Sequence, residues 1–77
     1  MRCYFHVLNG KRLVDDIEVA DLDAAKLEAV TYTGTILMTE HPTDMWDGTP
    51  WEMKVTDQPS PNRGRTYLTL TVTAGTS

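Results

Sequence analysis

The stretch CYFHVLNGKRLV, residues 3–14, decides the fold of this 77-residue chain. Residues along a strand point alternately to the two faces of a sheet, and apolar residues alternate here from the start. We therefore predict a first strand with two different faces, formed by Cys3, Phe5 and Val7 on one side and Tyr4, His6 and Leu8 on the other.

The dipeptide Asn9-Gly10 marks the end of this strand. A two-residue type I′ turn needs a positive φ at both positions, and Asn-Gly meets that need best. A second strand should then resume at once, so that the two form a hairpin. The expected cross-strand neighbours are Leu8 with Lys11, His6 with Leu13, Phe5 with Val14, and Tyr4 with Asp15.

The stretch between Asp21 and Pro42 predicts a helix. Asp21 is a good N-cap, because its carboxylate can accept a hydrogen bond from the first turn. A stripe of mostly small residues recurs at helical spacing, namely Leu22, Ala25, Ala29, Tyr32 or Thr33, and Ile36. The helix should end before Pro42. A break near Gly34 is the alternative, since glycine within a helix costs roughly 1 kcal/mol relative to alanine.

Two further strands follow the helix. In WEMKVTD, residues 51–57, we expect an inward face of Trp51, Met53 and Val55 and an outward face of Glu52, Lys54 and Thr56. In RTYLTLTVT, residues 65–73, the two faces are Leu68, Leu70 and Val72 inward and Tyr67, Thr69 and Thr71 outward. Its stretch YLTLTVT, residues 67–73, is uncharged and would be hazardous as a free edge. It should lie inside the sheet or pair with its copy in a second chain.

The element order predicts an α+β domain of two layers. The order is β-β-α-β-β, in which a four-stranded, mainly antiparallel sheet is covered on one face by one helix. We expect a single domain over residues 1–74 and a frayed tail at 75–77.

The composition argues against several classes of protein, namely nucleic-acid-binding, disulfide-bonded and membrane-spanning ones. The net charge is −4, and acids are concentrated in residues 15–28, where only Lys26 opposes them; such a field repels phosphate backbones. The single cysteine, Cys3, excludes an internal disulfide. No segment resembles a membrane span or a signal peptide. We therefore expect a cytoplasmic protein.

Several motifs carry a resemblance to a known family. These motifs are YFHV followed by Asn9-Gly10, then DLDAAKLEA, then Trp51 with Val55 and Asp57, then Gly64-Arg65 with Leu68. In them the chain resembles small, uncharacterised alphaproteobacterial proteins that are grouped as a domain of unknown function. Their pattern is Y-F-H-V-x-D/N-G, D-L-x-A-A-x-x-E-A, W-x-x-x-V-x-D and G-R-x-L. The chain departs from it in DDIEVA, which lacks a glycine, and in longer loops. The resemblance implies a fold and a bacterial origin, but no activity.

His6 is the sharpest candidate for a binding residue, with Tyr4 and Tyr67 beside it on the predicted uncovered face. It could instead be a structural histidine that bonds a neighbouring strand or a carboxylate, and Asp15 is a possible partner. General-base catalysis would need a second group in hydrogen-bond reach. Aromatic residues on a sheet also suit RNA binding, but few basic residues accompany them here.

The loop HPTDMWDGTP, residues 41–50, supplies a second candidate region. His41, Asp44 and Asp47 could bind a metal ion, but their spacing matches no established motif. Trp46 either covers an edge of the core or, if exposed with Met45, anchors a partner. We assign no catalytic residue, no metal ligand and no cofactor.

These observations leave three functional hypotheses. The leading one is a small protein-interaction or regulatory module whose partner is a second copy or another protein. The second is a nucleic-acid-linked regulator, such as an antitoxin-like partner. The third is a small metal-binding or catalytic protein that uses His6 or His41.

Overall fold

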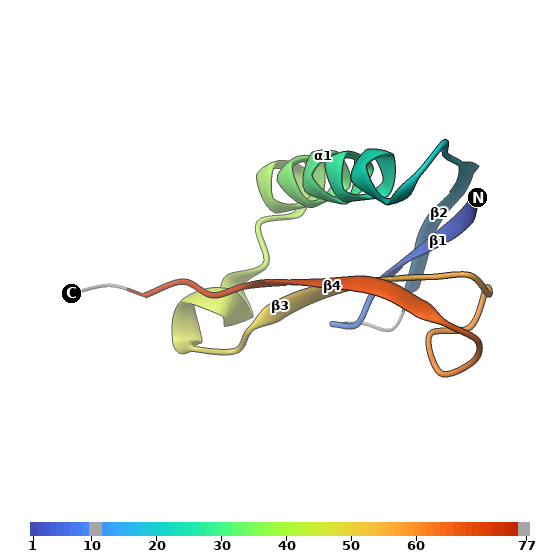
Figure 1. Ribbon diagram of the computed structural model, residues 1–77. Helices are drawn as coiled ribbons and strands as arrows, with labels where there is room; N and C mark the ends of the chain where they lie inside the picture. The colour runs from blue at the N-terminus through green and yellow to red at the C-terminus, as the bar shows by residue number, and fades with distance from the viewer. Residues whose placement is uncertain (10–11, 76–77) are drawn as a thin grey trace.

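The computed structural model describes residues 1–9 and 12–75, and it confirms the predicted α+β architecture (Figure 1). Its elements are β1 (Arg2–Val7), β2 (Arg12–Glu18), α1 (Leu22–Glu40), the 3-10 helix η1 (Thr43–Asp47), β3 (Trp51–Thr56) and β4 (Thr66–Val72). The four strands form one antiparallel sheet in the order β2-β1-β3-β4. Helix α1 covers one face, and we call the other the open face.

The predicted pairing of β1 with β2 is confirmed at His6 and wrong at Phe5 and Tyr4. His6 pairs with Leu13 as predicted, whereas Phe5 pairs with Asp15 and Tyr4 with Asp16. A bulge between Phe5 and His6 causes the one-residue shift, because an extra residue on one strand displaces all later pairs. The turn predicted at Asn9-Gly10 and the Leu8–Lys11 pair lie outside the described residues.

Helix α1 has the predicted boundaries. The Asp21 carboxylate accepts a hydrogen bond from Ala24 N–H at 2.9 Å, and His41 ends the helix in the left-handed conformation at φ 48°. The helix continues through Gly34, so the alternative of a break there is wrong. The buried stripe contains Ala25, Ala29, Thr33 and Ile36, whereas Leu22 at the first position is exposed.

The core lies between α1 and the centre of the sheet. Its buried apolar members are Cys3, Phe5, Val7, Ala25, Ala29, Ile36, Trp51, Met53 and Val55. The small alanines let the helix approach the sheet closely, and the ring of Tyr32 packs edge-on against Phe5 at 4.9 Å between centroids. Burial also raises the pKa of the Cys3 thiol, which makes this cysteine a core residue with little nucleophilic character.

Two predictions about the second half need correction, and one needs an addition. Strand β4 is at the edge of the sheet, not inside it. Thr56 lies on the predicted outward face, but it is buried there. Part of the predicted 41–50 loop forms η1. Of the predicted tail, residues 76–77 lie outside the described part of the chain. Within residues 1–9 and 12–75, no helix is long and apolar enough to span a membrane.

Candidate functional site

His6 projects from β1 onto the open face, yet only 2% of its surface is exposed. The reason is the connection between β3 and β4, residues 57–65, which bends to the side of the sheet away from α1 (Figure 1). The Nε2 atom of His6 lies 2.9 Å from Thr56 Oγ1 and 3.3 Å from the carbonyl oxygen of Gln58. His6 therefore contacts both a neighbouring strand and the connection above it.

The hydrogen-bond pattern assigns His6 a structural role. Thr56 Oγ1 donates its proton to the Gln58 carbonyl oxygen at 2.6 Å, so this hydroxyl accepts from the Nε2–H of His6. This assignment of the tautomer follows from the network. Nδ1 is then the unprotonated ring nitrogen, but His6 is almost fully buried and Thr56 is fully buried, so neither side chain can reach a substrate. The pair of His6 and Thr56 thus fixes the connection in place.

The 57–65 connection is held at its base and at its middle. Asp57 N–H donates to the Arg65 carbonyl at 3.0 Å, and Asp57 Oδ1 accepts from Arg65 N–H at 2.7 Å. Lys54 Nζ donates to the Pro61 carbonyl at 2.9 Å. Gly64 has a positive φ of 73°, which a residue with a side chain rarely adopts. Asp57, Gly64 and Arg65, which belong to the family-like motifs, therefore build this closure.

The protonation of His6 makes the stability of the protein depend on pH. Burial lowers the pKa of His6 below its ordinary value of 6.5, the positive charge of Lys54 lowers it further, and the Gln58 carbonyl acts in the opposite direction. A depressed pKa means that the unfolded chain binds the proton more readily than the folded chain. The free energy of unfolding should thus be independent of His6 above pH 6.5 and fall as the pH drops below it.

We therefore expect urea unfolding to show lower stability at pH 5.5 than at pH 7.5. A His6→Gln variant keeps a side-chain N–H donor but does not titrate, so the difference between the two pH values should shrink in that variant. His41→Gln is the matched control, since His41 is exposed and its replacement should leave the difference unchanged. An equal pH dependence in the wild type and in His6→Gln would contradict this account.

Of the two tyrosines predicted to flank His6, Tyr4 lies on the same face of the sheet and Tyr67 does not. Tyr4 precedes His6 by two residues on β1, is half-buried and pairs with Asp16 and Thr56 across the sheet. A second bulge pairs Thr56 with Thr66 and leaves Tyr67 as the extra residue of β4. Tyr67 lines a cavity of about 270 Å³ together with Met1 and Leu22, at the N-terminal end of α1. This position separates Tyr67 from His6.

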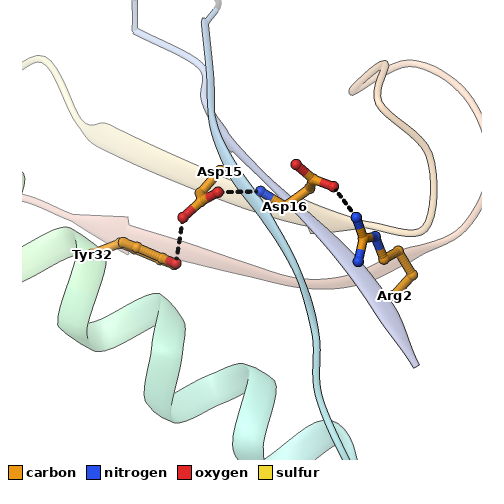
Figure 2. A network of polar contacts seen from close by, with 4 residues as sticks. All are labelled: Arg2, Asp15, Asp16 and Tyr32. Carbon is orange, nitrogen blue, oxygen red and sulfur yellow. Dashed lines mark hydrogen bonds and ion pairs between the residues drawn. The ribbon is translucent and has the colours of Figure 1, made fainter.

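The suggested partner of His6, Asp15, belongs to a different network (Figure 2). One oxygen of its carboxylate accepts from the Tyr32 hydroxyl at 2.9 Å, and the other accepts from Asp16 N–H at 2.8 Å. Asp16 in turn pairs with Arg2 at 2.5 Å. Burial, the bond to Asp15 and nearby negative charges raise the pKa of Tyr32 to about 12. The network joins α1 to β2 and leaves no carboxylate for His6.

The 41–50 region presents Trp46 and a shallow cavity. Trp46 is 59% exposed on η1, whereas its neighbour Met45 is half-buried. A cavity of about 290 Å³ lies between the end of α1, η1 and β3, and His41, Asp44 and Trp51 line it. Among the described residues, no group of three or more His, Cys, Asp or Glu side chains could hold a metal ion. Trp46 is thus placed as a surface aromatic, separate from His6.

The two edges of the sheet differ in chemistry. Strand β2 has the sequence RLVDDIE and is paired irregularly at its bulge, and both charge and a bulge protect an edge from further pairing. Strand β4 has the sequence TYLTLTV, without charge or proline. Thr69 and Thr71 are exposed on it. The edge at β4 therefore lacks those protections.

Hydrogen bonding fixes which backbone groups of β4 point outward. Leu8 N–H donates to the Glu52 carbonyl, and Glu52 N–H donates to Asn9 Oδ1, so the backbone of Glu52 faces β1. Alternation then turns Met53 and Val55 toward β4, where they pair with Leu70 and Leu68. The N–H and C=O groups of Thr69 and Thr71 consequently point out of the sheet.

The helix-covered face of β4 is also incompletely buried. Leu68, Leu70 and Val72 are half-buried, whereas Met53 and Val55 on the neighbouring strand are fully buried. The apolar layer of the sheet thus extends past the cover that α1 provides. Sequence reasoning missed a further exposed apolar set, Leu27, Val30 and Met38 on α1. The signal in the sequence is their spacing, which places Leu27 and Met38 on the side of the helix opposite Ala25, Ala29 and Ile36.

Comparison with known proteins identifies the family. The sequence model of the family described as Domain of unknown function (DUF6894) matches residues 2–73, and this chain belongs to that family. Neither a curated protein nor a solved structure is significantly similar to the chain. Family membership confirms the predicted resemblance to a domain of unknown function and assigns no activity.

Proposed function

We propose that this DUF6894 family member is a small cytoplasmic protein-interaction module that associates with a second copy of itself through β4. The observation that carries the proposal is the outer side of this strand. In the part of the chain that the structure describes, no strand pairs with it, although Thr69 and Thr71 direct backbone donors and acceptors outward. Addition of a strand to such an edge is a common mode of protein recognition.

A two-fold axis at Thr69 gives the pairing that best fits the side chains. Thr69 then faces Thr69 of the second copy, and Leu68 faces Leu70 on the helix-covered side. Both copies contribute the half-buried leucines to one continuous apolar layer, and each copy places its helix on the same side of an enlarged antiparallel sheet. The pairing is isologous, as in most homodimers, and it completes the burial that the isolated edge leaves unfinished.

Charge and compartment support a protein partner. A nucleic-acid surface would need several free basic residues around the tyrosines. Arg2, which lies beside Tyr4, is paired with Asp16, Arg65 lines the cavity of Tyr67, and the net charge of the chain is −4. The absence of charge on β4 suits a second uncharged strand better than a phosphate backbone. The cytoplasmic assignment is supported by the free, buried cysteine, which suits a reducing compartment.

The test is a charge exchange at the proposed two-fold axis. In Thr69→Lys or Thr69→Glu alone, like charges meet across the axis, and we expect at least about ten-fold weaker dimerisation, the effect of roughly 1.4 kcal/mol. An equimolar mixture of the two variants should recover the dimer, because opposite charges then meet. Light scattering over a concentration series measures the mass in each case.

The matched control is Thr49→Lys, which adds the same charge at an exposed threonine of the loop before β3. It should dimerise like the wild type. A wild-type chain that stays monomeric at high micromolar concentration would contradict the proposal. So would Thr69 variants with wild-type association.

A further inference from the structure

The side of α1 that faces away from the sheet is apolar in its middle. Leu27, Val30 and Met38 are 69%, 59% and 69% exposed. Leu27, Thr31, Gly34 and Met38 follow the alternating spacing of four, three and four residues. That is the heptad spacing of a helix seam that packs against another helix. We call these four residues the outer seam.

The outer seam is also free of charge and of unsatisfied hydroxyl groups. Thr31 Oγ1 donates to the Leu27 carbonyl oxygen within the same helix at 3.0 Å, so its methyl group is left for packing. Gly34 has no heavy atom within 4 Å of the position where a Cβ would lie, which leaves room for close approach of a second backbone. A surface helix normally exposes polar residues on this side, whereas the outer seam of α1 also exposes two large apolar residues, Leu27 and Met38.

We propose that the outer seam packs antiparallel against the outer seam of a second copy of this chain. In that arrangement Leu27 faces Met38 of the second copy, and Thr31 faces Gly34. Each large residue at the ends of the seam meets a large one, and the small residues meet at the centre. The seam therefore complements itself in shape when the two helices run in opposite directions.

Charge favours the same arrangement. The charged side chains near the ends of the seam are paired within each chain, Lys26 with Asp23 and Glu40 with Arg12, so the helix dipoles decide the direction. Antiparallel helices bring the positive N-terminal end of each dipole beside the negative C-terminal end of the other. A parallel pair would bring like ends and like charges together.

The exposed area sets the strength of this contact. Three apolar side chains exposed to this extent present on the order of 350 Å², comparable to the largest apolar patch of a typical monomer. A standard interface buries about 800 Å² per partner, so we expect weak association through the seam alone. Helix α1 lies over one face of the sheet (Figure 1), and β4 is at the edge of that sheet. Leu27 and Met38 of the seam are exposed, so the seam and β4 are separate parts of the surface. Both contacts can therefore form at once.

The experiment is a complementation test in the Thr69→Lys chain, where pairing through β4 is blocked. Light scattering should show this chain passing from monomer to dimer as the concentration rises. Adding Leu27→Glu or Met38→Lys should weaken this step at least about ten-fold. A mixture of the two should restore it, because Glu at position 27 then meets Lys at position 38 of the other chain. Thr49→Lys, which adds the same charge at an exposed loop position away from α1, should dimerise unchanged.

Each alternative result overturns a defined part of the proposal. Association that the seam substitutions leave unchanged would exclude the seam as the contact. Loss of association that mixing does not restore would exclude the antiparallel register. A Thr69→Lys chain that remains monomeric at every concentration would exclude self-packing of α1 altogether. Failure of the β4 proposal leaves this test intact, because Thr69→Lys is then only a surface substitution. Equal melting temperatures of all variants verify that the fold is retained.

Discussion

Replacement of Phe5 by alanine is expected to lower the free energy of unfolding by about 3–5 kcal/mol, the usual range for a phenylalanine deleted from a core. Phe5 is fully buried, pairs with Val55 in the sheet and contacts the ring of Tyr32 on α1. The substitution removes apolar burial and leaves a cavity between the two layers. Small domains have only about 0.05–0.15 kcal/mol of stability per residue, so Phe5→Ala should be largely unfolded at 37 °C.

Urea unfolding followed by tryptophan fluorescence measures the loss, since Trp51 is in the same core. Leu13→Ala is the matched control, because Leu13 lies on the adjacent strand but is 46% exposed. It should change stability by less than about 1 kcal/mol. A Phe5→Ala chain as stable as Leu13→Ala would mean that the two layers are not held together at Phe5.

Replacement of Gly64 by alanine is expected to destabilise the protein by about 2–4 kcal/mol, through two effects that add. The first is backbone strain, since an L-residue in the left-handed region costs roughly 1–2 kcal/mol, and φ at Gly64 is 73°. The second is a collision, because a Cβ there would lie 2.2 Å from Asp57 Oδ1. Relief of this collision would break the bond from Arg65 N–H and loosen the closure over His6.

Gly48→Ala separates the two effects. Gly48 also has a positive φ, of 94°, but no heavy atom lies within 4 Å of its would-be Cβ. It should therefore show the strain alone and a smaller loss in chemical denaturation than Gly64→Ala. In Gly64→Ala the amide proton of Arg65 should also exchange faster. Equal losses for both glycines would contradict the role of Gly64 in holding Asp57.

The fold could be predicted from the sequence wherever a local pattern determined the structure. The alternation around Phe5, the cap at Asp21, the proline after α1 and the apolar face of Trp51, Met53 and Val55 each indicate one element. Single-residue bulges carry no comparable signal in the sequence. One bulge places Asp16, not Asp15, opposite Tyr4. The other leaves Tyr67 out of the pairing between β3 and β4. A regular register would have kept Asp15 opposite Tyr4 and Tyr67 within the β3–β4 ladder.

The candidate site was harder to predict because it depends on tertiary contacts. Alternation placed His6 and Thr56 correctly on the open face, but nothing local indicates that residues 57–65 fold back over them. The position of β4 at the edge likewise follows from strand order, which four similar strands do not specify. The uncharged composition of β4 predicted either a strand inside the sheet, which is wrong, or a strand that pairs with a second copy, which stays a prediction.

The measurement that tests the central claim most directly is amide hydrogen exchange at Thr69 and Thr71, resolved by NMR over a concentration series. In a monomer both N–H groups point into solvent and exchange quickly, whereas those of Leu68 and Leu70 bond to β3 and are protected. Pairing through β4 predicts that protection of Thr69 and Thr71 rises with concentration toward that of Leu68 and Leu70. Exchange at Thr69 and Thr71 that stays fast while the mass doubles would show that the chain associates without this edge.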